Sequence, residues 1–390
     1  MMKRQTPTTT QHLSLALSSL LFLSSTLFAR GDPLSISTTD DFITFANNVN
    51  NGSNYAGETV YLIDDLDFSS YSSSFVPVGK SNDGNTFRGT FYGNGHVISN
   101  LKISTDEFPF LSVFGYSTGI TIKNLVVDSS CSFESNSPGN NQDDYYSASV
   151  AGVLGRYDSN DGECVVDGCV NMAFIKYTGA NVNCIYLGGI VGKISPGKHN
   201  ILINNCVNYG NISSANPHGE SIRVGGILGE IYSYAQSAAS IAIKNCVNYG
   251  SLVQSGDVNN NLFMGGISCV DRFSTVYEGC VNLGTISYDN SVSSNVGVGS
   301  ISGKSNGANF TNCFWDSSIG LGVTGQASTD TKTQGTVESF NTTSITNPAV
   351  LDILESTGNI EFAVLNLESN GGSAVGPVLI ILNSETKKGI

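Results

Sequence analysis

One sequence unit recurs five times from Ser149 onward. Each copy opens with a Gly-rich segment such as Gly188-Gly-Ile-Val-Gly192 and continues with a segment such as Asn204-Asn-Cys-Val-Asn208. Most copies end with a short third segment such as Gly210-Asn-Ile212. The Cys of the second segment stands at positions 169, 206, 246, 280 and 313, with spacings of 37, 40, 34 and 33 residues. Motifs of fixed length separated by variable stretches indicate a stacked repeat whose loops accept insertions.

The short segments exclude a helical repeat, because each apolar run is brief and is broken by Gly and Asn. We therefore expect an all-β protein, a right-handed parallel β-helix (solenoid) in which each unit forms one rung. Neighbouring rungs would lie roughly 4.8 Å apart, the spacing of paired strands. Every strand would pair with the rung on each side, so only the two ends of the stack would leave open edges.

Stacking in register predicts columns of identical side chains. One column contains Ile190, Ile227, Ile267 and Ile301, with Val153 at its start, and the repeated Cys form a second. A third contains Asn171, Asn208, Asn248 and Asn282. Cys and Asn stand two residues apart, so they face the same side of a strand. We expect both inside, with the Asn amides hydrogen bonded along the stack.

The chain divides into five segments by pattern: a signal peptide at 1–31, an N-terminal cap region at 32–57, irregular rungs at 58–148, regular repeats at 149–316, and a C-terminal cap and tail at 317–390. Phe42, Phe45, Ala46 and Val49 have helical spacing, which predicts a short capping helix with Thr38 or Thr39 as its N-cap. Residues 347–354 could form a C-terminal helix with Pro348 in its first turn. The structure of 356–390 is not predicted.

The chain begins like a secretory signal. Lys3 and Arg4 precede an apolar stretch from Leu13 to Phe28, and cleavage is expected after Gly31. A membrane anchor is the alternative, but repeated Ser dilutes a stretch already short for a span. Losing residues 1–31 would remove three basic residues and no acidic ones, taking the net charge from −14 to −17. We expect an extracellular protein, secreted or at the cell surface, that binds no nucleic acid and does not insert in a membrane.

Four Asn-X-Ser/Thr sequons fit this location and predict a glycoprotein. They begin at Asn51, Asn211, Asn309 and Asn341.

Several motifs resemble those of the GLUG-motif repeat proteins. The opening of such arrays is similar to the run Phe87-Arg-Gly-Thr-Phe-Tyr-Gly-Asn-Gly-His-Val-Ile-Ser-Asn-Leu101. The motif itself is resembled by Gly189-Ile-Val-Gly192 and Gly226-Ile-Leu-Gly229. The end of such arrays is resembled by Asn312-Cys-Phe-Trp-Asp316. The resemblance covers about residues 35–355. It implies a right-handed β-helix in secreted or microbial cell-surface proteins, often linked with adhesion, and no catalytic residues. Cys269 and Ser300 depart from the motif where Gly is expected, which questions the regularity of the last two rungs.

Nine Cys in a secreted chain suggest disulfides, yet nine is odd. Side chains stacked in register point in parallel, which makes the disulfide torsion hard to satisfy. We favour a column of buried thiols. Pairing of Cys164 with Cys169, or of Cys184 with a column member, stays open. Such a column lacks the tetrahedral geometry of a zinc site, and neither a metal nor another cofactor is expected.

Catalytic signals are sparse. His96 could be a base, but a His after a tight turn is more often structural, and Asp64, Asp65 and Asp67 fit turn caps better than calcium ligands. A polysaccharide lyase or glycoside hydrolase needs carboxylates and cations from neighbouring rungs. The column after the Gly-rich segment mixes signs: Arg156, Lys193, Glu230, Val270 and Lys304. We interpret Lys193 and Glu230 as a surface pair, which leaves no concentrated catalytic column.

Tyr209 and Tyr249 align in adjacent rungs between Met172 and Leu283. They could form a stripe that binds a glycan or a cell-surface protein, or they could pack under a loop. The leading hypothesis is a non-catalytic, adhesin-like binding protein. The alternative is a polysaccharide lyase or glycoside hydrolase on a β-helix scaffold, and a third possibility is a structural coat component.

Overall fold

A computed structural model describes residues 34–71, 75–139, 147–158, 161–179, 182–215, 219–232, 240–271, 275–289, 295–327, 332–340, 361–365 and 378–382. The fold described below is that of the compact unit formed by residues 35–390, the second of two units into which the chain divides. The expected signal peptide at 1–31 lies outside the described residues, as do the expected helix at 347–354 and the sequon at Asn341.

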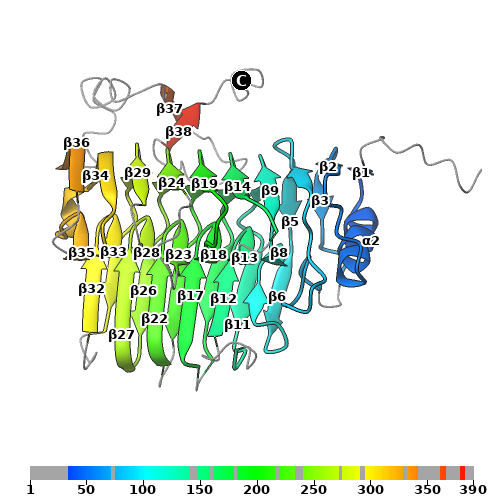
Figure 1. The fold of residues 1–390 in the computed structure, drawn as a ribbon, viewed down its shortest axis with the longest axis horizontal. Coiled ribbons are helices and arrows are strands. Elements are labelled where there is room, and N and C mark those ends of the chain that lie inside the picture. The colour runs from blue at the N-terminus through cyan, green and yellow to red at the C-terminus, as the bar shows by residue number, and fades with distance from the viewer. Residues whose placement is uncertain are drawn as a thin grey trace, which may run out of the picture. The chain divides into compact units, whose positions relative to one another are not determined.

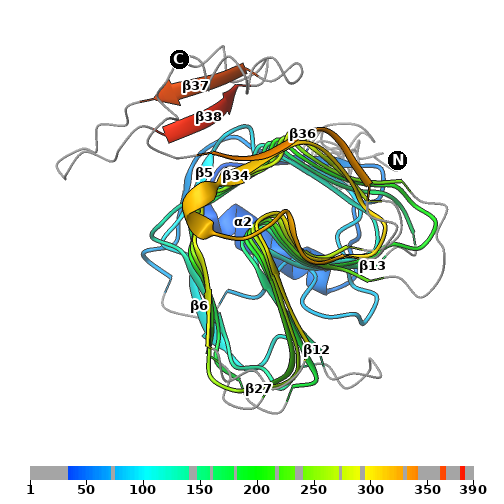
Figure 2. The same ribbon diagram turned by 90° about the vertical axis from the view of Figure 1, so that its left-hand side faces the viewer.

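The second unit is a parallel β-solenoid, which confirms the all-β fold expected from the repeat (Figure 1). Its strands fall into four stacks, in which each strand pairs in parallel with its counterparts in the neighbouring rungs. Figure 2 looks along the stacks, where the strands of successive rungs superpose.

Two six-stranded sheets and one seven-stranded sheet are present in the described ranges. The first contains β6 (Lys102–Thr105), β11 (Ser132–Ser135), β16 (Phe174–Tyr177), β21 (Ile212–Ala215), β26 (Leu252–Ser255) and β31 (Ile286–Tyr288). The second contains β7 (Phe110–Leu111), β12 (Ser147–Ala151), β17 (Cys184–Gly188), β22 (Gly219–Gly225), β27 (Val258–Gly265) and β32 (Asn295–Gly299). The third contains β8 (Phe114–Ser117), β13 (Leu154–Asp158), β18 (Val191–Ser195), β23 (Leu228–Ile231), β28 (Ser268–Val270), β33 (Ser302–Ser305) and β35 (Thr324–Ala327).

The largest sheet carries two strands per rung, because the chain bends just before the repeated Cys. The first series contains β1 (Leu34–Ile36), β2 (Thr59–Leu62), β4 (Thr90–Tyr92), β9 (Ile120–Lys123), β14 (Cys164–Asp167), β19 (Ile201–Asn204), β24 (Ile241–Lys244), β29 (Val276–Glu278), β34 (Asn309–Asp316) and β36 (Lys332–Phe340). The second contains β3 (Leu66–Asp67), β5 (Val97–Ser99), β10 (Val126–Val127), β15 (Val170–Asn171), β20 (Val207–Asn208), β25 (Val247–Asn248) and β30 (Val281–Asn282).

The residue before each Cys explains the bend. Asn205 and Asn245 have φ near +52°, and Gly168 and Gly279 occupy the same left-handed region. Gly enters this region without steric cost and Asn tolerates it better than most residues. This requirement accounts for the Gly or Asn that precedes every repeated Cys in the sequence.

The Gly-rich segment is not a single strand, which corrects the three-strand unit expected from the sequence. In the central rung β17 ends at Gly188, the chain turns through Gly189 and Ile190, and β18 begins at Val191. A Cβ atom on Gly189 would lie 2.3 Å from the Cγ atom of Asn208. The turn therefore requires Gly wherever a rung places an Asn amide behind it.

The Asn column is confirmed as a buried ladder. Asn171 Nδ2 donates to Asn208 Oδ1, Asn208 Nδ2 to Asn248 Oδ1, and Asn248 Nδ2 to Asn282 Oδ1, each at 2.9 Å. Each amide also bonds the backbone of its own turn, as Asn208 does with the N–H and the C=O of Gly210. All four side chains are fully buried, so the ladder satisfies polar groups that would otherwise be costly to bury.

The Cys column is confirmed as well. The five repeated Cys are fully buried, and all nine Cys of the chain are free thiols, with only Cys184 half-buried. The pairings that stayed open, Cys164 with Cys169 and Cys184 with a column member, are not formed. The departures at Cys269 and Ser300 leave the register intact, because β28 pairs with both β23 and β33.

Helix α2 (Thr39–Asn50) covers the N-terminal end of the stack, as expected (Figure 1). Thr38 is its N-cap and forms a capping box with Asp41. Phe42 and Phe45 point into the core, where their rings contact Phe91 and Phe87 at centroid distances of 6.0 and 5.3 Å. Burial of such aromatic side chains stabilises the end that strand pairing cannot close.

Toward the C-terminus β34 pairs with β36, and η1 (Ser317–Ile319) follows β34. β37 (Glu361–Leu365) and β38 (Val378–Leu382) pair with each other as an antiparallel hairpin. Among the described residues no helix has the length and apolar character needed to cross a membrane.

We predict that Asn208→Ala lowers the free energy of unfolding by about 2–4 kcal/mol, because it removes one buried hydrogen bond from the amide on each side and two from the backbone of Gly210. Urea denaturation of the full chain followed by circular dichroism measures this change. Asn211→Ala, in the same rung but exposed, is the matched control and should stay within about 0.5 kcal/mol of the wild type. Equal effects of the two substitutions would contradict the stabilising role of the ladder.

Candidate functional site

The two predicted tyrosines lie together on the outside of the stack. The rings of Tyr209 and Tyr249 are stacked, with centroids 4.8 Å apart and planes 9° from parallel. Tyr209 N–H donates to the Asn171 carbonyl and Tyr249 N–H to the Asn208 carbonyl, both at 2.7 Å. The backbone of the pair is therefore held directly against the buried Asn ladder.

Met172 and Leu283 occupy the same position in the rungs on either side, and we call these four residues the tyrosine row. Met172 is 36% exposed and both tyrosines are half-buried. One face of each Tyr ring is covered by the ring of the other Tyr. That face is therefore not open to a partner. Burial raises the pKa of Tyr209 to about 12, so its hydroxyl stays protonated at neutral pH.

The described sequon residues differ in exposure. Asn51 and Asn211 are exposed, whereas Asn309 is half-buried within β34 and its Oδ1 atom has no hydrogen-bond partner. Asn211 accepts a hydrogen bond from Ser251 N–H through Oδ1 at 3.0 Å. Among the described residues, Asn51 and Asn211 are therefore the more accessible candidates for glycosylation.

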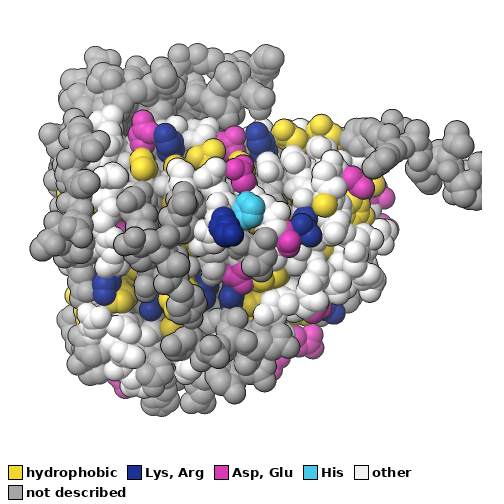
Figure 3. Space-filling view, viewed as in Figure 1, with side chains coloured by type: hydrophobic (Ala, Val, Ile, Leu, Met, Phe, Trp, Pro, Cys, Tyr) yellow, Lys and Arg dark blue, Asp and Glu magenta, His cyan; other side chains and the backbone are white. Residues whose placement is uncertain are grey.

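A second group of chemically active side chains lies where the chain turns between the second and third sheets, a corner visible between β12 and β13 in Figure 2. Tyr186 and Arg223 project from β17 and β22, while Lys193 and Glu230 project from β18 and β23. We call these four residues the corner cluster. Figure 3 shows basic side chains in a row along this face.

The corner cluster is tightly interconnected. Arg223 forms an ion pair with Glu230, and Lys193 Nζ lies 4.5 Å from the ring centroid of Tyr186. Burial, the largest single effect, disfavours the charged guanidinium, but the Glu230 carboxylate and its neighbouring groups together outweigh burial and raise the pKa of Arg223. Similar cation–π contacts continue along the corner, with Arg156 5.1 Å from the Phe110 ring centroid and Lys304 5.0 Å from that of Phe263.

The interpretation of Lys193 and Glu230 as a surface pair is wrong. Lys193 is 6% exposed and Glu230 is fully buried, because the corner folds the two sheets over them. Glu230 Oε2 and Arg223 Nε are buried without hydrogen-bond partners. The cluster therefore has the residue types of a polysaccharide-cleaving site but not the access that a polymer substrate needs.

Tyr186 and Arg223 were missed by the sequence analysis, which examined only the column after the Gly-rich turn. A signal for them does exist. The position two residues before each Gly-Gly or Ala-Gly pair reads Ser149, Tyr186, Arg223 and Phe263, and these residues share one register.

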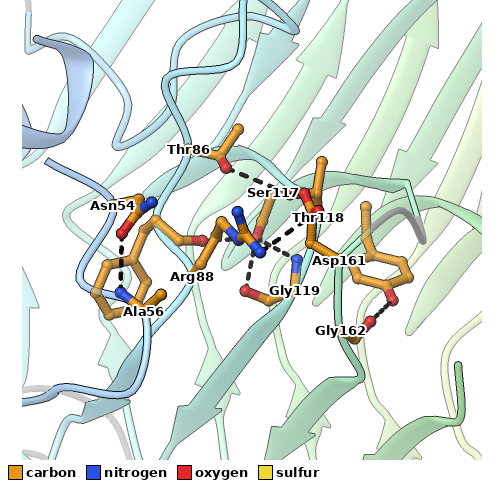
Figure 4. Close-up of polar contacts among 11 residues, drawn as sticks. Asn54, Ala56, Thr86, Arg88, Ser117, Thr118, Gly119, Asp161 and Gly162 are labelled. Atoms are coloured by element: carbon orange, nitrogen blue, oxygen red, sulfur yellow. Dashed lines mark hydrogen bonds and ion pairs between the residues drawn. The ribbon is translucent and has the colours of Figure 1, made fainter. Parts of the chain in front are cut away.

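Loops of three neighbouring rungs meet in a third polar group, drawn in Figure 4. Arg88 Nη2 lies 3.4 Å from Asp161 Oδ1, and Thr118 donates to Asp161 Oδ2 at 2.8 Å. Ser117 donates to the Phe87 carbonyl at 2.7 Å. The Arg88 and Asp161 side chains are 31% and 40% exposed, so their ion pair contributes at most about 1 kcal/mol. This group clamps loops of neighbouring rungs together.

Of the Asp residues expected as turn caps, Asp64 and Asp67 bond the backbone of their own turn, whereas Asp65 bonds the next rung. Asp65 Oδ1 accepts from the Val97 N–H at 2.9 Å and lies 3.1 Å from His96 Nδ1. Asp67 Oδ1 accepts from the Ser69 N–H at 2.8 Å. The hydrogen bond from Val97, the largest contribution, lowers the pKa of Asp65, so its carboxylate is ionised at neutral pH.

Asp271, like Glu230, carries a fully buried carboxyl group. Asp271 accepts hydrogen bonds from Ser302 Oγ at 2.9 Å, Ser305 Oγ at 3.1 Å and the Asn306 N–H at 3.0 Å. Burial, which opposes ionisation more than these bonds favour it, raises the pKa of Asp271 to about 6.

We predict that Asp271 makes the protein less stable as the pH rises. Its pKa is higher in the folded state than in the unfolded chain, so its contribution is fully present below about pH 4 and is lost as the pH passes through about 6. The shift corresponds to roughly 3 kcal/mol. The stability difference between the wild type and Asp271→Asn, measured by urea denaturation between pH 4 and 7.5, should change by this order. A difference independent of pH would show that Asp271 titrates normally.

Comparison with known proteins supports the fold of this chain but assigns it no enzymatic activity. No protein-family model matches the chain, and no curated protein matches it significantly. Among solved structures the chain is similar to a "putative immunoglobulin A1 protease" from Bacteroides ovatus, with a TM-score of 0.60 and 19% identity over 90% of this chain and 93% of that one. At this identity the likeness establishes a β-solenoid fold alone. The GLUG-repeat resemblance stays a prediction.

Proposed function

We propose that this is a secreted or cell-surface glycoprotein that binds a glycan or a protein on another surface, as an adhesin does, without catalysis. The tyrosine row carries the proposal. It sets two stacked aromatic side chains and an exposed Met172 at consecutive rungs, and a buried hydrogen-bonded ladder fixes their backbone. Rigid aromatic side chains are frequent centres of binding surfaces, because little entropy is lost when they are covered.

Two further observations favour binding over catalysis. The most reactive group of side chains, the corner cluster, is buried to the extent that Glu230 has no exposed surface. Phe174, 37% exposed, lies two residues beyond Met172 and widens the apolar surface beside the tyrosine row. Such a surface is expected to be covered by a partner when the protein is in use.

The test is binding of the purified chain to glycan arrays and to cells. The double variant Tyr209→Ala/Tyr249→Ala should weaken binding at least about tenfold, the effect of losing one strong contact residue. Tyr61→Ala/Tyr92→Ala is the matched control, because Tyr61 and Tyr92 form a similar stack, 5.3 Å apart and 11° from parallel, elsewhere on the outer surface. Binding that is lost equally in both double variants, or absent in the wild type, would refute the proposal.

The alternative is a polysaccharide lyase or glycoside hydrolase. The corner cluster favours it, since Glu230, Arg223, Lys193 and Tyr186 bring together the types of group that such reactions use. The expected result, however, is no release of reducing sugar or unsaturated product from a polysaccharide panel. If the wild type instead released such a product while Glu230→Gln, shown by circular dichroism to be folded, did not, the enzymatic function would replace binding as the leading proposal.

A further inference from the structure

A pocket of about 270 Å³ lies beside β6, the first strand of its six-stranded sheet in the described residues. Its lining comes from two segments far apart in the sequence, one after β3 and one between β5 and β6. The lining residues are Phe68, Ser69, Tyr71, Phe75, Asn100, Leu101 and Lys102.

The floor of the pocket is apolar and fixed. Phe68 and Leu101 are 2% exposed and Phe75 is 7% exposed. The Phe75 ring packs between Phe68 and Phe42 of helix α2, at centroid distances of 5.7 Å to each. The pocket is thus built on the aromatic core of the N-terminal cap and exists before any ligand binds.

The rim is polar, and the hydrogen bonds already made there decide what it can still offer. The Tyr71 hydroxyl donates to Asp40, so its oxygen remains an acceptor. Asn100 Nδ2 donates to Asp67 Oδ1 at 2.8 Å, so the Asn100 carbonyl oxygen also remains an acceptor. Lys102 is exposed at the start of β6 and supplies N–H donors.

We infer that this pocket binds one neutral sugar ring at the end of a glycan, an inference that rests on the proposed binding function. A sugar hydroxyl both donates and accepts, and a sugar ring has an apolar face, so it matches acceptors and a donor above an aromatic floor. An apolar peptide side chain would leave these rim groups unsatisfied.

Charge and size narrow the ligand further. Asp40 and Asp67 are hydrogen bonded to the two acceptor residues, and their two negative charges exceed the single positive charge of Lys102, which disfavours a carboxylate or sulfate on the sugar. The volume is below the roughly 300–1,000 Å³ of sites for drug-sized ligands, so the pocket takes one ring rather than a chain of them.

The pocket shares a face with the tyrosine row. Lys102, Ser132 and Phe174 occupy one register column of β6, β11 and β16, so Phe174 lies two rungs, or roughly 10 Å, from Lys102. A glycan whose terminal ring fills the pocket would extend along this column toward Phe174 and Met172. The two features therefore form one continuous surface.

The test is titration of the full chain with glycans that end in a neutral hexose or N-acetylhexosamine, and with matched glycans that end in a uronic or sialic acid. Lys102→Met and Asn100→Gly each remove rim groups, and Gly suits the φ of +58° at position 100. Each should weaken binding of the neutral glycans about tenfold. Lys198→Met, another exposed Lys, should leave binding within about twofold of the wild type. Thermal unfolding of each variant confirms that the fold is kept.

The outcomes separate this inference from the proposed function. Glycan binding that depends on the tyrosine row but not on Lys102 or Asn100 would overturn the pocket and leave the function standing. Binding to a cell-surface protein but to no glycan would do the same. Tighter binding of the acidic glycans would overturn the choice of a neutral sugar. If the wild-type chain bound neither a glycan nor a cell-surface protein, both the sugar pocket and the proposed function would be overturned.

Discussion

The hydrogen-bonded amides of Asn171, Asn208, Asn248 and Asn282 are the interaction on which the regular part of the solenoid depends. Each amide bonds the turn of its own rung and the amide of the next rung, so it specifies local conformation and stacking register together. Bonds aligned in one direction polarise one another in a low-dielectric interior. The same amides impose Gly at the opposite turn, where a Cβ on Gly226 would lie 2.4 Å from the Cγ atom of Asn248.

This coupling explains why the fold could be predicted from the sequence. The ladder repeats its residue type along the stack, and its steric consequence repeats as well, so the pair of Asn208 and Gly189 recurs in the first four of the five units. The buried Cys column follows from the same periodicity, since Cys and Asn stand two apart on one strand. The left-handed residue before Cys is likewise restricted to Gly or Asn by backbone sterics alone.

The candidate sites were predicted less well, because they arise from contacts that do not repeat. Tyr209 and Tyr249 were found since they occupy a repeated position. The corner cluster was missed because Tyr186 and Lys193 belong to two strands that were taken as one, which hid the turn that brings them together. The pocket escaped notice for a related reason: Tyr71 and Lys102 belong to irregular N-terminal rungs and meet only through the fold.

Every amide of the ladder donates toward the C-terminal side, which gives the array a direction. If a unit were duplicated between two rungs, its Asn would accept from the Asn amide on one side and donate to the Asn amide on the other. The number of rungs can therefore change by duplication without other changes in the core. The ladder ends at the first rung whose side chain at this position cannot accept the hydrogen bond of the preceding Asn. Trp315 pairs in register with Asn282 but has no side-chain amide. The ladder of amides therefore ends at Asn282. The length of the amide ladder is thus set at position 315, although strand pairing continues from β34 to β36 beyond it.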